Sequence, residues 1–202
     1  MLSITVTGKG LVRFHDAVRA LGDAKAKRAY AMALNKTAGK VNTQVKRAVA
    51  AQMGVTQQTI IKRGALRRRP ATVGNLEATI DASGKHLPLK DFRPVQRKKG
   101  VSAKPWGRQH LFGGTWIDRG RAAKTGIGPN TRAAAGGHVF KNTGGFNKKS
   151  GRFNAIESLW GPAVPKEIVK GESERAFYRV ARTELPIEVR RAITVVTKGS
   201  VS

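Results

Sequence analysis

Apolar residues recur at helical spacing over residues 24–52, a stretch without proline and with a single glycine, Gly39. In a helix that turns about 100° per residue, positions three and four apart share one side. The apolar side consists of Tyr30, Leu34, Ala38, Val41, Val45, Ala48 and Val49. The opposite side carries Lys25, Lys36, Lys40 and Arg47. The pattern predicts one long amphipathic helix with a buried face and a cationic face.

Helix-end signals bracket this segment. Residues 10–21 show the spacing of a shorter helix, with Gly22 as its end and Asp23 as the N-cap of the long helix. Gly54 is expected to end the long helix, and Thr56 to cap a short helix over residues 57–63.

Alternating and broken patterns replace helical spacing in the middle of the chain. Arg67-Arg68-Arg69-Pro70 is expected to form a turn. Residues 71–80 alternate between apolar and polar positions and predict a strand, and residues 87–92 and 95–101 predict shorter ones. Residues 110–117 predict another strand, with a bulge at the glycines inside it.

Residues 118–154 contain eight glycines and eight basic residues and show little periodicity, apart from an apolar island at residues 138–140. They predict a flexible basic arm. Helical spacing returns over residues 166–183, and Pro186 is expected to separate that helix from a last one over residues 187–196.

These elements predict an α+β fold in which a long N-terminal helix and C-terminal helices pack on a small, mainly antiparallel sheet. The length favours a single domain over residues 1–202, with residues 118–154 as a flexible basic insertion.

The charge of the chain indicates an anionic partner. The chain has 39 basic and 12 acidic residues, a net charge of +27, and residues 24–76 hold twelve Lys or Arg and no acid. Self-repulsion of this size favours an anionic partner, such as nucleic acid or an acidic protein. The residues predicted to contact DNA or an acidic partner are Arg67, Arg68, Arg69, Arg97, Lys98, Lys99, Lys148 and Lys149.

Nothing in the sequence predicts reading of bases. Zinc-finger spacing, an RNP motif and a helix-turn-helix pattern are missing, and aromatic residues make up only 6% of the chain. DNA contact is therefore expected to involve the backbone alone. Trp106, Trp116 and Phe140 are predicted as anchors of an interface between proteins.

Catalysis finds no support in the motifs. The four histidines lie in separate segments, although a metal site of His110, His138 and Asp118 is conceivable, and no phosphate loop or nucleophile elbow is present. We therefore expect no enzyme, no metal and no cofactor. A nuclease that uses Asp81, Asp91 and a metal stays open as an alternative. The chain has no cysteine, no apolar run long enough for a membrane span, and no signal-peptide pattern at residues 1–10.

A series of motifs resembles one known family. The series runs through the helix at residues 31–38 with its centre Asn35-Lys-Thr-Ala38, the short helix and basic run at residues 55–69, and residues 76–80, 87–92 and 96–101. It closes with residues 156–165. Together and in this order, these motifs resemble the prophage minor tail protein Z family, the tail completion proteins of long-tailed bacteriophages. Two departures are Asn154-Ala155, where the family usually has a proline, and the long glycine-rich insertion at residues 119–152.

The resemblance implies a virion structural protein at the head-proximal end of the tail, assembled in the host cytoplasm, which completes the tail and helps join it to the head. Its implied partners are identical subunits in a ring, commonly six-fold, adjacent tail terminator, tail tube or neck proteins, and packaged DNA by non-specific contact. A sequence-independent DNA-binding protein that acts through phosphate contacts is the alternative function.

Overall fold

The computed structural model describes residues 2–4, 23–63, 65–118, 137–146, 151 and 155–197. They form two compact units. The first, here called the helical unit, takes its described residues from Met1–Val49, Ile60–Gly84 and Val164–Ser202. The second, here called the β unit, takes its described residues from Ala50–Thr59 and Lys85–Ala163. The single domain expected from the sequence stays a prediction.

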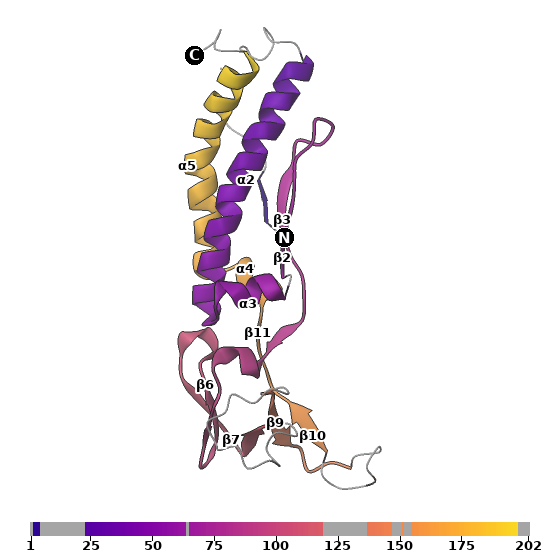
Figure 1. Ribbon diagram of the computed structural model, residues 1–202, viewed down its shortest axis with the longest axis vertical. Helices are drawn as coiled ribbons and strands as arrows, with labels where there is room; N and C mark the ends of the chain where they lie inside the picture. Colours follow the sequence, from indigo (N-terminus) through magenta and orange to yellow (C-terminus); the bar gives the residue numbers. More distant parts are fainter. Residues whose placement is uncertain are drawn as a thin grey trace. The chain divides into compact units, whose positions relative to one another are not determined.

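Two long helices, α2 (Asp23–Met53) and α5 (Gly171–Val196), lie side by side in the helical unit (Figure 1). They are antiparallel, because Ala29 and Ala33 contact Ala192, whereas Lys40 bonds to Glu184 and Glu188. Small residues at one end of the pair allow close approach of the backbones. The predicted long helix is confirmed, and Leu34, Ala38, Val41, Val45 and Val49 of its predicted apolar side are buried.

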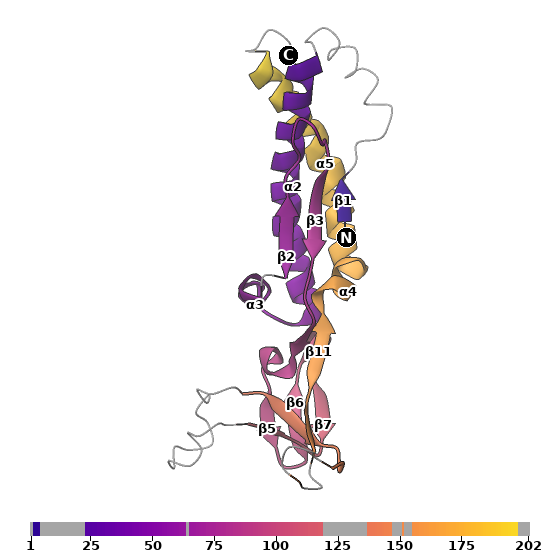
Figure 2. The same ribbon diagram turned by 90° about the vertical axis from the view of Figure 1, so that its right-hand side faces the viewer.

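A three-stranded antiparallel sheet lies along α2, as Figure 2 shows. Its order is β1 (Leu2–Ile4), β3 (Ala78–Ala82), β2 (Leu66–Arg69). The short helix α4 (Val164–Ile168) packs near β3 and leads to α5. Ile80, Ile168 and Phe177 are fully buried here, so the core of this unit lies between the sheet and the helices.

The turn after α2 follows the sequence prediction. Gly54 has φ of +77°, a left-handed conformation that suits glycine and ends a helix. The Thr56 hydroxyl accepts a hydrogen bond from the Thr59 backbone N–H at 3.2 Å, which caps α3 (Gln57–Lys62).

The β unit contains three small antiparallel sheets. Their strands are β4 (His86–Pro88) with β11 (Trp160–Ala163); β5 (Val95–Arg97), β6 (Gly100–Ala103) and β7 (His110–Gly113); and β8 (Thr115–Ile117), β9 (Val139–Asn142) and β10 (Ile156–Ser158). Two 3-10 turns, η1 (Leu89–Phe92) and η2 (Pro105–Gly107), connect them. Phe92 is fully buried, and Gly161 lies so close to its ring that a Cβ has no room there. The predicted α+β class is confirmed.

The tribasic segment is a strand, so the predicted turn is wrong. Arg67, Arg68 and Arg69 belong to β2 and pair with Asp81, Ile80 and Thr79 of β3, respectively. Alternate side chains of a strand point to opposite faces, so Arg68 lies on the face opposite to Arg67 and Arg69, which reduces repulsion within the run. The strand predicted over residues 71–80 begins only at Ala78, since Thr72 and Asn75 bond to each other's backbone in a turn.

Pro186 does not divide the C-terminal helix, which also corrects the sequence prediction. Helix α5 runs without interruption from Gly171 to Val196. A proline inside a helix removes one backbone hydrogen bond. Packing of Ala181 and Glu188 on the buried side, together with ion pairs from Glu184 and Glu188, holds the two halves in line.

Other strand predictions change in detail. Residues 87–92 divide into β4 and η1, and residues 95–101 form the β5–β6 hairpin. Residues 110–117 form two strands in different sheets, β7 and β8, because Gly114 turns the chain at φ of +64°. The predicted arm at 118–154 contains a real strand, β9, which lies between β8 and β10. Outside β9, the structure describes only residues 118, 137–138, 143–146 and 151 of the arm. The rest of the arm lies outside the described residues, and so does the helix predicted at residues 10–21.

Candidate interaction surfaces

The three arginines of β2 have different surroundings. The Arg68 guanidinium donates to the backbone oxygen of Asn35 at 3.1 Å, so it lies against α2. Arg69 forms an ion pair with Asp81, 2.6 Å between Nε and Oδ2. Arg67 is exposed and has no carboxylate partner among the residues that the structure describes. Two of the three predicted contacts are therefore already engaged within the helical unit.

Asn35 ties the chain that follows β2 to the long helix. Its side-chain amide donates to the backbone oxygen of Ala71 at 2.9 Å, and its side-chain oxygen accepts from the backbone N–H of Ala71 at 2.7 Å. This pair of bonds satisfies both backbone groups of a residue that is only 5% exposed. The Asn35-Lys-Thr-Ala38 motif thus has a structural role at its first position.

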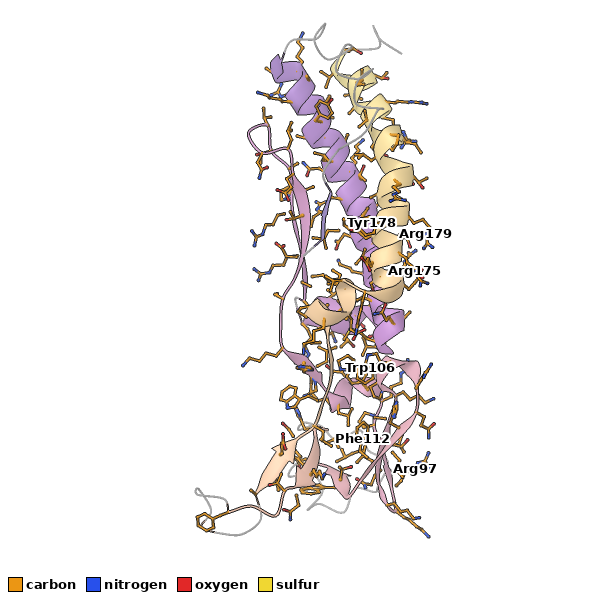
Figure 3. All side chains as sticks on the ribbon, turned by 180° about the vertical axis from the view of Figure 1, so that it is seen from behind. Arg97, Trp106, Phe112, Arg175, Tyr178 and Arg179 are labelled. Atoms are coloured by element: carbon orange, nitrogen blue, oxygen red, sulfur yellow. The ribbon has the colours of Figure 1, made fainter. Side chains whose placement is uncertain are left out.

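A second basic cluster lies in the β unit, at the turn between β5 and β6. Arg97, Lys98 and Lys99 are exposed, and no ion pair involves them in the described part of the chain. Arg97 is labelled in Figure 3. With Ser102, Gln109 and Leu111 they line an open groove of about 440 Å³.

Gln96 holds this basic hairpin in place. Its amide donates to the backbone oxygen of Gly100 at 3.1 Å, and its side-chain oxygen accepts from the N–H of Ile117 at 2.9 Å. The cluster is therefore a set of cations on a fixed frame, suited to phosphate or carboxylate groups. Lys148 and Lys149 lie outside the described residues.

The predicted anchors are partly exposed aromatic residues of the β unit. Trp116 on β8 and Phe140 on β9 are cross-strand neighbours, with ring centroids 6.4 Å apart. Trp116 is 38% exposed and Trp106, in η2, is 50% exposed. Trp160 on β11 is 51% exposed. Exposed tryptophans in a unit with a small core are typical of surfaces that become buried in an assembly.

A comparison with known protein families identifies the chain. Residues 9–198 match the family model described as prophage minor tail protein Z (GPZ). The chain belongs to this family. It is a phage minor tail protein, and a role as a structural component of the virion follows from membership. No curated protein and no solved structure gives a significant match.

Several of the candidate catalytic and metal-binding residues have structural partners in this minor tail protein. Asp81 is the ion-pair partner of Arg69, and the backbone N–H of Asp118 donates to the backbone oxygen of His138 at 2.8 Å. The described residues contain no group of three His, Cys, Asp or Glu that could hold a metal ion. None of the described helices is both long and apolar enough to span a membrane.

Two features of the minor tail protein were missed by the sequence analysis. One is the bonding of Lys40, on the predicted cationic face of α2, to Glu184 and Glu188 of α5. The other is an arginine row on the outer side of α5, formed by Arg175, Arg179 and Arg182. These arginines are four and three residues apart, a spacing that places them on one side of a helix. Glutamates lie beside them in the sequence, so the segment does not stand out as a basic run.

Proposed function

We propose that this minor tail protein completes the head-proximal end of the tail and helps join the tail to the head around the DNA channel. The observation that carries the proposal is the basic hairpin of the β unit. Arg97, Lys98 and Lys99 are exposed, unpaired within the described residues and fixed on a frame by Gln96. DNA beside this fixed cationic surface supplies phosphates that offset part of the net charge of +27, and such contacts do not read bases.

The ring of identical subunits, six-fold in the proposal, is supported by the aromatic residues. Trp106, Trp116 and Phe140 offer apolar contacts that do not depend on charge, which suits association between copies that repel one another. Closed cyclic symmetry is the usual form of such association. The adjacent partners in the proposal are tail terminator, tail tube or neck proteins.

Deletion of the gene, followed by complementation, tests the proposed function. We expect a deleted phage to accumulate filled heads and separate tails, and the wild-type gene to restore joined particles, as counted by electron microscopy. Labelled protein is expected at the head-proximal end of the restored tails. Joined particles without the protein, or a label at the distal tip, would contradict the proposal.

The high charge also favours a second candidate, a sequence-independent DNA-binding protein acting alone. A salt titration of the purified chain with duplex DNA separates the two. Tight binding by the free monomer that falls steeply with salt favours this second function. Weak or absent binding by the free monomer favours assembly, in which DNA contact depends on the ring.

A further inference from the structure

We propose that the outer side of α5 is a docking surface for an acidic segment of a neighbouring virion protein. The surface, here called the α5 arginine face, consists of Arg175, Tyr178, Arg179 and Arg182. The inference rests on the proposed function, because it identifies one of the adjacent partners in the tail as a protein with an acidic segment. It differs from the basic hairpin, which is in the β unit.

The fold of the helical unit places these four side chains on one surface. Ala176, Phe177 and Ala181 are buried on the opposite side of α5, which turns the arginines to solvent. Arg175, Tyr178 and Arg179, labelled in Figure 3, are all exposed residues of α5. With Arg182 and Thr183 they line a shallow groove of about 580 Å³.

One carboxylate of the chain itself, that of Glu172, already contacts this surface. Arg179 Nη1 lies 3.4 Å from Glu172 Oε1, and the two side chains are 67% and 51% exposed. An ion pair this exposed contributes little stability, so a partner carboxylate can replace Glu172 at low cost. Arginine is well suited to this exchange because its planar guanidinium binds a carboxylate through two parallel hydrogen bonds.

The composition of the face favours a protein over DNA. Its charged members are all arginines, with a tyrosine among them, and arginine and tyrosine are enriched in the centres of protein interfaces, where lysine is depleted. Tyr178 is 47% exposed, and its ring packs edge-on against buried Phe177, with centroids 5.4 Å apart. A ring fixed in this way loses little conformational freedom when a partner covers it.

A second copy of the chain has few carboxylates to offer. Its net charge of +27 repels the face, and ion pairs within the described part of the chain engage five of its acidic residues. These five are Asp81, Glu167, Glu172, Glu184 and Glu188. The charge of the α5 arginine face is therefore complemented by a different, acidic protein.

The test uses the purified full chain and a fluorescent poly-glutamate peptide at low salt. We expect the triple variant Arg175→Gln, Arg179→Gln, Arg182→Gln to bind the peptide at least about tenfold more weakly, since three exposed charge pairs are lost. The matched control removes three exposed charges of α2 through Lys25→Gln, Lys27→Gln and Arg28→Gln, with an expected change below about twofold. Circular dichroism confirms that both variants are folded.

Three outcomes would overturn the inference: no measurable binding of the peptide, an equal loss in the two variants, or a larger effect of the α5 variant on binding of duplex DNA than of the peptide.

The proposed function has a separate readout. When the α5 triple variant complements a gene deletion, unjoined heads and tails support both ideas. Normal joining despite lost peptide binding overturns the docking role alone, and joined particles in the uncomplemented deletion overturn the proposed function alone.

Discussion

Lys40 on α2 donates a hydrogen bond of 2.8 Å to Glu188 on α5, whose side chain is only 2% exposed. The ammonium group also donates to Glu184 at 2.6 Å, and Arg191 donates to the same Glu188 oxygen at 2.8 Å. Glu184 and Glu188 flank Pro186. One lysine therefore connects the two long helices on both sides of the proline.

This arrangement predicts loss of stability in acid. The hydrogen bond from Lys40 lowers the pKa of Glu188 below its ordinary value of 4.5, against the opposing effect of burial. A lowered pKa in the folded state stabilises the fold above pH about 4.5, and this stabilisation is lost as the pH falls through the folded-state pKa. Bonds to Glu184 and Glu188 raise the pKa of Lys40, so its contribution is present below pH 10.5 and lost as the pH rises through the raised value.

We therefore expect Glu188→Gln to lower the melting temperature at pH 7. Between pH 5 and pH 3, the melting temperature of this variant is expected to decrease less than that of the wild type. Thermal unfolding followed by circular dichroism across this range measures both effects. The control is Glu174→Gln on the same helix, for which no such change is expected. Parallel curves for Glu188→Gln and the wild type would contradict this explanation.

The continuous helix predicts that removing its proline stabilises the helical unit. In the interior of a helix, proline is less favourable than alanine by about 3 kcal/mol. Pro186 is exposed, so Pro186→Ala restores a backbone donor without disturbing the core. We expect the free energy of unfolding to rise by about 1–3 kcal/mol in urea titrations. A decrease would mean that α5 requires its proline. Ile187→Ala, at a neighbouring exposed position, is expected to change stability little.

The sequence predicted those elements whose pattern is local. Helix α2 could be predicted because buried Leu34, Val41 and Val45 repeat at helical spacing. Strand β2 could not, because its pairing with β3 and the bond from Arg68 to Asn35 join residues far apart in the chain. For the same reason, Pro186 was predicted as a break, since the ion pairs that hold α5 together come from α2.

Prediction of the candidate surfaces is limited in the same way, because contacts between distant residues are not visible in the sequence. A run of basic residues is visible in a sequence, but its partners are not. Arg69 pairs with Asp81, twelve residues later, whereas Arg97, Lys98 and Lys99 have no such partner among the residues that the structure describes. Charge runs therefore identified candidate contacts, and only the fold separated engaged cations from available ones.

Asn35 is predicted to be the most sensitive polar position of α2. Asn35→Ala leaves the buried backbone N–H and oxygen of Ala71 without partners, at an expected cost of about 2–3 kcal/mol in the free energy of unfolding. Asn35→Asp keeps the acceptor but loses the donor, so an intermediate cost is expected. Urea titration of both variants measures the costs, with exposed Gln44→Ala as control. Equal stability of wild type and Asn35→Ala would contradict the role of these bonds.

The contact between Gly161 and Phe92 predicts a strict size limit in the β unit. A Cβ at residue 161 overlaps the edge of the Phe92 ring, which is fully buried and cannot move without disturbing its neighbours. Gly161→Ala is expected to cost about 1–3 kcal/mol. Gly74→Ala has no atom within 4 Å of its new Cβ and is the matched control. Thermal unfolding compares the two, and an unchanged melting temperature for Gly161→Ala would show that the β unit repacks freely.

The proposed ring of identical subunits predicts that copies of the chain associate through the aromatic pair of the β unit. Trp116 is 38% exposed and packs beside Phe140, so Trp116→Ala removes a large apolar contact from the surface while the strand pairing of β8 and β9 remains. An interface anchor of this kind contributes about 2 kcal/mol or more, which weakens self-association by about thirtyfold. Sedimentation over a concentration series measures this change, and circular dichroism confirms that the variant is folded. Val73→Ala, at a position 45% exposed in the helical unit, is expected to leave association unchanged. If both variants associate like the wild type, the subunits meet through another surface, because an anchor cannot be removed without weakening the interface that buries it.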